Sequence, residues 1–181
     1  MGRQMKDNVR SYAITGLYRT YCSRGGTREH EGKLSEAIIE YTKAIRTDPT
    51  NPEAYCLRAD TNKNRDFPRA IADYTKAIEI DHDFLVAYFH RGMAHFYKKD
   101  YDNAILDYEK AKKIQPKISE EIDPYLADAF VKRGDARKEK KEFQEAIKDY
   151  ERFIKLAPKH KDVLVIRQAI LNLKAKMRIG G

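Results

Sequence analysis

This chain of 181 residues lacks most of the features of secreted, membrane-bound or disulfide-linked proteins. Its two cysteines, Cys22 and Cys56, fit no zinc or redox spacing, so we expect two small apolar residues in a reducing compartment. No apolar run approaches the length of a membrane-spanning helix. The first residues, up to Asp7, carry charges where a secretory signal needs an apolar stretch. These absences predict a soluble, cytoplasmic protein.

Motifs for catalysis and cofactor binding are also missing. The sequence has no glycine-rich phosphate loop, no nucleophile elbow and no metal-ligating helix motif. His90 and His95 are five residues apart, whereas a step of three or four would direct both toward one ion. We therefore expect no cofactor, no metal and no enzyme activity, although a catalytic site assembled from distant helices stays open.

The formal net charge of +8 is concentrated at the two ends of the chain. Residues 1–33 have a net charge of +4 and residues 159–181 of +5, while the residues between them net −1. One hypothesis is that the basic ends bind nucleic acid. We favour basic ends that only interact with solvent, because their positive residues are not interleaved with the exposed aromatics of a known nucleic-acid module.

The sequence does contain a phrase that recurs four times. Each copy begins with alanine and isoleucine, continues with a tyrosine three residues after the isoleucine, and ends with an alanine or phenylalanine three residues later. The copies are Ala37-Ile38-x-x-Tyr41-x-x-Ala44, Ala70-Ile71-x-x-Tyr74-x-x-Ala77, Ala104-Ile105-x-x-Tyr108-x-x-Ala111 and Ala146-Ile147-x-x-Tyr150-x-x-Phe153. Their period of 33, 34 and 42 residues is typical of helix-turn-helix repeats that stack on one another. Since Pro49, Pro116 and Pro158 follow the leading alanines by twelve residues, the phrase predicts the second helix of each repeat.

A second pattern precedes each phrase and predicts the first helix. An aromatic residue is followed four positions later by a small one, which places both on the same helix face. The four pairs are Tyr12/Gly16, Tyr55/Ala59, Tyr88/Gly92 and Phe130/Gly134. The small residue would let the second helix approach closely while the aromatic fills the space beside it.

Together the two patterns resemble the tetratricopeptide repeat family over residues 9–158. The sequence departs from the family pattern in three places. It has His82 in place of a terminal proline, Phe153 in place of a small residue, and nine extra residues in the first copy. The resemblance implies an all-α fold: an α-solenoid of about four helix-turn-helix repeats plus a C-terminal capping helix. We expect one domain over residues 1–181, with repeats at residues 9–50, 51–84, 85–118 and 124–159.

Local signals predict where individual helices begin and end. In the first copy we expect a helix over residues 7–22 and a flexible loop over the glycine-rich residues 23–32. Asn51 before Pro52 predicts an N-cap and a first helical position. Asp123 before Pro124 predicts the same in the fourth copy, with the residues before them lengthening a linker or adding a turn to the helix.

The closing segment, residues 161–178, has an apolar stripe on one side. Its members are Val163, Ile166, Ile170, Leu173 and Met177, with Leu164 and Leu171 beside them. We expect this helix to cap the last repeat. The alternative, a dimerising coiled coil, needs a stripe of three or four heptads, and this one spans about two.

The resemblance further implies that the first helices line a concave groove for a protein or peptide partner. The expected groove residues are Ala13, Leu17, Cys56, Asp60, Lys63, Phe89, Met93, Phe96, Val131, Asp135 and Lys138. Phe89, Met93 and Phe96 form an apolar patch, which is the best candidate for the binding site. The alternative is that the chain itself covers these three side chains.

One branch of the family holds the C-terminal carboxylate of heat-shock chaperones with lysines, asparagines and an arginine in the groove. The corresponding places here are Ala13, Leu17, Leu57, Val86 and His90, which offer no fixed positive charge. We therefore expect a protein-interaction scaffold without this carboxylate clamp. The alternatives are a nucleic-acid-associated module acting through the basic ends and a scaffold that assembles with copies of itself.

Overall fold

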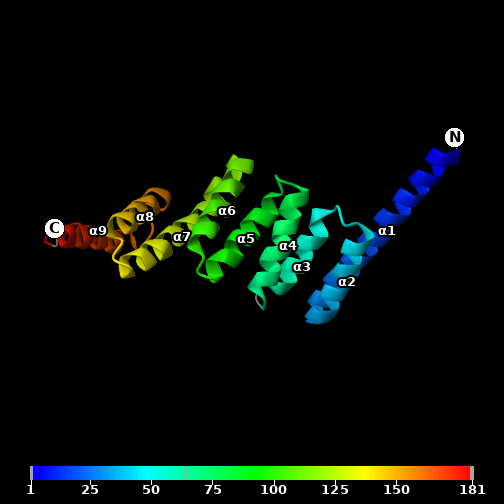
Figure 1. The fold of residues 1–181 in the computed structure, drawn as a ribbon, viewed down its shortest axis with the longest axis horizontal. Helices are drawn as coiled ribbons and strands as arrows, with labels where there is room; N and C mark the ends of the chain where they lie inside the picture. Colours follow the sequence, from blue (N-terminus) through cyan, green and yellow to red (C-terminus); the bar gives the residue numbers. More distant parts are fainter. Residues whose placement is uncertain (1, 64, 180–181) are drawn as a thin grey trace. The chain divides into compact units, whose positions relative to one another are not determined.

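A computed structural model describes residues 2–63 and 65–179, with side chains described from Tyr12 to Arg178. Within these ranges the regular structure is entirely helical (Figure 1). The helices are α1 (Gly2–His30), α2 (Leu34–Thr47), α3 (Pro52–Asn62), α4 (Phe67–Ile80), α5 (Leu85–Tyr97), α6 (Tyr101–Ile114), the 3₁₀ helix η1 (Pro116–Ile118), α7 (Ser119–Glu139), α8 (Phe143–Leu156) and α9 (Val163–Ile179). The all-α fold class is therefore confirmed. In the described residues, no helix is both long enough and apolar enough to cross a membrane.

The chain divides into two compact units, one ending at Ala94 and one beginning at His95, so the division lies inside α5. In the first unit α1 packs on α2, α2 on α3, and α3 on α4. In the second unit α6 packs on α7, α7 on α8, and α8 on α9. Consecutive helices thus form helix-turn-helix pairs within each unit (Figure 1). The single domain over residues 1–181 stays a prediction.

The recurring phrase forms the centre of each second helix, as predicted. Its leading residues, Ala37, Ala70, Ala104 and Ala146, are completely buried, and its tyrosines, Tyr41, Tyr74, Tyr108 and Tyr150, are at most 1% exposed. The small alanine permits close approach of the neighbouring helix, and the tyrosine ring fills the space beside it. Asn51 caps α3 as predicted, accepting a hydrogen bond from the Glu53 amide at 3.0 Å.

The first repeat corrects the predicted register. The helix predicted to end at residue 22 continues to His30, and only Glu31, Gly32 and Lys33 connect it to α2. A Cβ placed on Gly25 would lie 2.4 Å from Cε1 of Tyr41, whereas one on Gly16 would meet nothing within 4 Å. The aromatic and small pair is therefore Tyr21/Gly25, and the predictions of a loop over residues 23–32 and of nine extra residues between the helices are wrong. Packing on Tyr41 outweighs the helix penalty of about 1 kcal/mol that a glycine carries.

The fourth repeat also differs from the prediction. Its first helix, α7, begins at Ser119, so Asp123 and Pro124 lie inside the helix and do not form its cap. The eight extra residues of this repeat extend the helix toward its N-terminus, which is one of the two outcomes expected for them. Pro124 is the sixth residue of α7, so the helix lacks one backbone hydrogen bond at this position. The Asp123 carboxylate pairs instead with Lys112 of α6.

Three of the connections between paired helices contain a residue with left-handed backbone geometry. Gly32 has a φ of 74°, and Lys99 and Lys141 each have a φ of 63°. Each of these residues stands five positions before the leading alanine of its phrase. The same turn is therefore built once with glycine and twice with lysine.

The last helix, α9, packs on α8 and caps the second unit, as predicted. Val163, Ile166, Ile170 and Leu173 are 3–8% exposed. On the opposite side Leu164, Val165 and Leu171 are 60–78% exposed. The helix α9 therefore has apolar residues on its exposed side as well as on the side that packs on α8.

Candidate functional site

Asp60 on α3 is the centre of a polar cluster in the first unit. Its Oδ1 accepts a hydrogen bond from the Tyr74 hydroxyl at 2.8 Å and lies 2.6 Å from Nδ1 of His90 and 3.3 Å from Nζ of Lys63. Burial raises the pKa of Asp60, but these three partners outweigh it and hold the pKa below its usual value. The first-helix face of this unit therefore presents a fixed, ionised carboxylate that is about one-quarter exposed (26%).

Two of the apolar residues predicted for the groove lie on α5, the helix that carries His90. Phe89 and Met93 on α5 are partly exposed, and the ring of Phe89 is 5.6 Å from that of His90. Cys56, by contrast, is buried in the core between α3 and α4, and burial raises the pKa of its thiol to about 12. Cys56 is thus a core residue, while Asp60, Lys63, Phe89 and Met93 reach the surface.

The second unit contains four of the predicted groove residues: Phe96, Val131, Asp135 and Lys138. Asp135 accepts a hydrogen bond from the Tyr150 hydroxyl at 2.7 Å and lies 3.3 Å from Lys138. Val131 and Phe96 are partly exposed, and the Phe96 ring packs edge-on against Tyr101 at 5.6 Å. Asp135 therefore repeats the arrangement of Asp60, with the same tyrosine of the phrase as its donor.

The corrected register changes which residues of the first repeat correspond to these positions. Cys22, Gly26 and Glu29 stand where the second repeat has Cys56, Asp60 and Lys63. The Glu29 carboxylate accepts hydrogen bonds from the hydroxyls of Tyr41 at 2.7 Å and Thr61 at 2.8 Å. Ala13 and Leu17 are exposed on the part of α1 that precedes this segment, so they are not the counterparts of Cys56 and Asp60. Whether they contact a partner stays a prediction.

Sequence reasoning missed a second set of polar residues. In each copy an arginine precedes the small residue of the first helix, and an acid precedes the phrase tyrosine. The arginines are Arg24, Arg58, Arg91 and Arg133, and the acids are Glu40, Asp73, Asp107 and Asp149. Arg58 donates two hydrogen bonds to Asp73, at 2.9 and 2.7 Å, and Arg133 donates two to Asp149, at 3.0 and 2.6 Å. The arginines and the acids recur at fixed positions in all four copies, so the sequence could have predicted these pairs.

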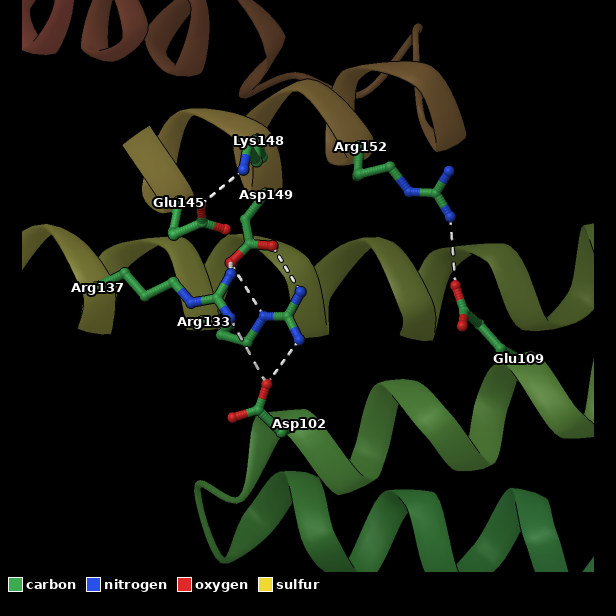
Figure 2. Close-up of polar contacts among 8 residues, drawn as sticks. All are labelled: Asp102, Glu109, Arg133, Arg137, Glu145, Lys148, Asp149 and Arg152. Carbon is green, nitrogen blue, oxygen red and sulfur yellow. Dashed lines mark hydrogen bonds and ion pairs between the residues drawn. The ribbon is translucent and has the colours of Figure 1, made fainter. Parts of the chain in front are cut away.

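The pair in the fourth repeat lies in a hollow of 440 Å³ formed by α6, α7 and α8, here called the arginine hollow (Figure 2). Arg137 donates a third hydrogen bond to Asp149 at 2.8 Å. Asp102, at the start of α6, accepts one from Arg133 Nη1 at 2.7 Å and lies 3.8 Å from Arg137 Nη2. The rim carries two ion pairs, Lys148 with Glu145 at 2.6 Å and Arg152 with Glu109 at 3.2 Å. The guanidinium groups of Arg133 and Arg152 each lie 5.3 Å from the ring of Phe130.

Models of the tetratricopeptide repeat match the chain at residues 86–118 and 127–160, and a TPR-repeat model matches residues 30–65. The chain belongs to the tetratricopeptide repeat family. Hsp70-Hsp90 organizing protein 2 of Arabidopsis thaliana is 37% identical to this tetratricopeptide repeat protein over 94 residues, which are 51% of this chain and 16% of that protein. Human DnaJ homolog subfamily C member 7 is 36% identical over 85 residues, 44% of this chain and 17% of that protein. The chain thus spans less than a fifth of the length of these relatives.

Solved structures of tetratricopeptide repeats resemble this chain as well. The first TPR of Spaghetti (RPAP3), bound to the HSP90 peptide SRMEEVD, has a TM-score of 0.59 and 28% identity, covering 63% of this chain and 90% of that one. The structure of MamA has a TM-score of 0.58 and 24% identity, covering 83% of this chain and 85% of that one, and it supports the fold alone.

Proposed function

We propose that this tetratricopeptide repeat protein is an interaction scaffold that binds a peptide or a helix of a partner protein along the face of its first helices. The observation that carries the proposal is the Asp60 cluster: an ionised, partly exposed carboxylate that contacts His90 of α5, the helix that also carries the partly exposed side chains of Phe89 and Met93. A fixed charge next to apolar surface can orient a bound segment and also contribute hydrophobic contact. A peptide-bound relative of the same fold, at 28% identity, supports this use of the repeats.

We further propose that this protein does not bind its partner by a C-terminal carboxylate. With the corrected register, the clamp positions hold Cys22, Gly26, Leu57, Val86 and His90. His90 is directed toward Asp60, and Asp60 would repel an incoming carboxylate. The expected ligand segment therefore has apolar residues with a basic or neutral residue next to Asp60.

Affinity capture with the intact protein and with a Met93→Lys variant tests the site. Leu164→Lys is the matched control, because it places the same charge on an apolar residue that is 78% exposed on α9. Desolvating a lysine against a partner should weaken a groove complex at least about tenfold, so partners should be lost with Met93→Lys and kept with Leu164→Lys. Circular dichroism must show both variants folded. Identical partner lists for the two would contradict the groove.

The partner's chemistry has a test of its own. A labelled SRMEEVD peptide titrated into the intact protein should show no saturation at micromolar concentrations. Micromolar binding would overturn the exclusion of a carboxylate ligand while leaving the scaffold proposal in place. The cytoplasmic location and the lack of enzyme activity stay predictions.

Self-assembly is a second candidate, favoured by the exposed side of α9. Leu164, Val165 and Leu171 are all more than half exposed on one short helix, and such a surface is available to a second copy. Sedimentation velocity over a hundredfold range of concentration decides between the two. Mass that rises with concentration in the intact protein and not in Leu164→Lys would support self-assembly.

A further inference from the structure

We propose that the arginine hollow binds a phosphoryl group on a phosphorylated segment of a partner protein, at the place now filled by Asp102. Arg133 and Arg137 form the floor of the hollow, with side chains 18% and 23% exposed. Lys148 and Arg152 stand on its rim (Figure 2). Four cations around one hollow of 440 Å³ is the arrangement by which arginine-rich sites hold phosphoryl oxygens.

The second repeat shows that the fold does not require all four cations. Its equivalent hollow, of 250 Å³, has two cations in its lining, Arg58 and Arg69, beside Asp73. Asn62 stands there in the place of Arg137 and Ala72 in the place of Lys148. Arg58 alone supplies both hydrogen bonds that the Asp73 carboxylate receives from an arginine. Arg137 and Lys148 are therefore additions to a pair that is already complete without them.

Asp102 marks the position of an anion between the two arginines. Its oxygen lies 2.7 Å from Nη1 of Arg133 and 3.8 Å from Nη2 of Arg137, yet the side chain is 71% exposed. An ion pair this exposed contributes little to stability, so a stronger anion can displace it at small cost. The Asp149 carboxylate, which is 2% exposed, would stay in place as the anchor of both arginines.

The charges favour a phosphoryl group over a carboxylate as the ligand. Four carboxylates already pair with the four cations: Asp102, Glu109, Glu145 and Asp149. A carboxylate ligand would therefore only replace one of these carboxylates with another of the same charge. A phosphoryl group brings a second negative charge and three acceptor oxygens, which can engage Arg133, Arg137 and a rim cation together. Residues 95–181 contain 21 basic and 15 acidic groups, and this excess attracts an anionic partner.

The surroundings of the hollow favour a peptide over free phosphate. Leu106, beside Asp102 on α6, is 62% exposed, and Phe130 and Ile105 continue the apolar lining. An apolar residue adjacent to the phosphorylated one would cover Leu106. The site therefore fits a phosphorylated residue flanked by an apolar side chain.

The proposal is tested by NMR titration of the full chain with N-acetyl-phosphoserine methylamide, the same compound without phosphate, and inorganic phosphate. Arg137→Asn with Lys148→Ala gives these two positions the residues of the second repeat, and binding of the phosphoserine compound should weaken about tenfold or more. Lys132→Ala with Lys155→Ala removes the same two charges from exposed sites on the same helices and should change binding less than about twofold. Asp102→Ser introduces the residue that the first repeat has at this position, and it should strengthen binding of the phosphoserine compound several-fold.

Saturable shifts in α6, α7 and α8 that require the phosphate and follow this order of variants would establish the site. Inorganic phosphate binding as tightly as the phosphoserine compound would assign the site to free phosphate, which overturns the peptide source. No saturable shifts, or equal weakening by the two double variants, would overturn the site itself. None of the substituted residues belongs to the groove, so this result is independent of the groove experiment.

Discussion

The tyrosines of the phrase act as buried hydrogen-bond donors as well as core residues. Tyr41, Tyr74 and Tyr150 donate to Glu29, Asp60 and Asp135, respectively. Burial, followed by these carboxylates, raises the pKa of each phenol above its ordinary value. Each hydrogen bond links the second helix of a repeat to the surface on its first helix that we propose for binding.

The raised phenol pKa values predict alkaline unfolding. A phenol with a pKa that is higher in the folded than in the unfolded state stabilises the fold below pH about 10, and this stabilisation is lost as the pH rises further. Tyrosinate absorbance and helical circular dichroism should be followed together from pH 8 to 13. Part of the absorbance of the twelve tyrosines should appear only as helicity is lost. Complete titration near pH 10 with unchanged helicity would contradict the buried donors.

The register of the first repeat makes a second prediction at this scale. Gly25→Ala places a Cβ against the Tyr41 ring and should destabilise the protein by about 1–3 kcal/mol. Gly16→Ala adds a Cβ where nothing lies within 4 Å on an exposed helix, and should stabilise by up to about 1 kcal/mol. Urea denaturation of both variants measures the difference. A larger loss of stability with Gly16→Ala than with Gly25→Ala would instead make Tyr12/Gly16 the packed pair.

The error in that register has a physical cause. Both Tyr12/Gly16 and Tyr21/Gly25 match the pattern of an aromatic residue followed four positions later by a small one. The adjacent glycines Gly25 and Gly26 are also typical of a loop. In the structure the contact between Gly25 and Tyr41, 16 residues away in sequence, decides between them. The correct pair was nonetheless recoverable from spacing, because Tyr21 precedes Ala37 by 16 residues, as Tyr88 precedes Ala104.

Among the elements, the second helices followed most directly from the sequence. Alanine, isoleucine and tyrosine recur at a helical spacing and meet the same environment in every repeat, so one pattern predicts four helices. The start of α7 was not predicted, because Pro124 after Asp123 has the form of a cap although it lies inside the helix. The arginine hollow was also missed, because its residues come from three helices and its volume depends on their packing.

The capping helix α9 can be tested with two leucines of opposite exposure. Leu173 is 3% exposed and Leu171 is 60% exposed on the same helix. Leu173→Ala should destabilise the protein by about 2–4 kcal/mol, because it leaves a cavity against α8. Leu171→Ala should change the free energy of unfolding by less than about 0.5 kcal/mol. Chemical denaturation of both variants is the measurement, and equal losses would mean that α9 is buried on both sides.

At the scale of the whole molecule, two compact units with separate buried residues predict separate local stabilities. In arrays of repeats a substitution acts mainly on its own repeat and its neighbours. Leu173→Ala should therefore speed amide hydrogen exchange in residues 95–179 more than in residues 2–63 and 65–94. Gly25→Ala should show the reverse order. Exchange that rises uniformly in either variant would show that the described chain unfolds as one cooperative body.

The lysines in the helix connections have a consequence for chirality. At a φ of 63°, Lys141 occupies a region that costs an L-residue roughly 1–2 kcal/mol and that a D-residue prefers. Assembling the protein by chemical ligation with D-lysine at this position would keep the charge and the side chain while removing the strain. The mirror-image residue should raise the melting temperature, and the same exchange at Lys155, inside α8, should lower it. The configuration at the Cα atom of one residue in each turn would then change the stability of the repeats without changing the side chains on their surface.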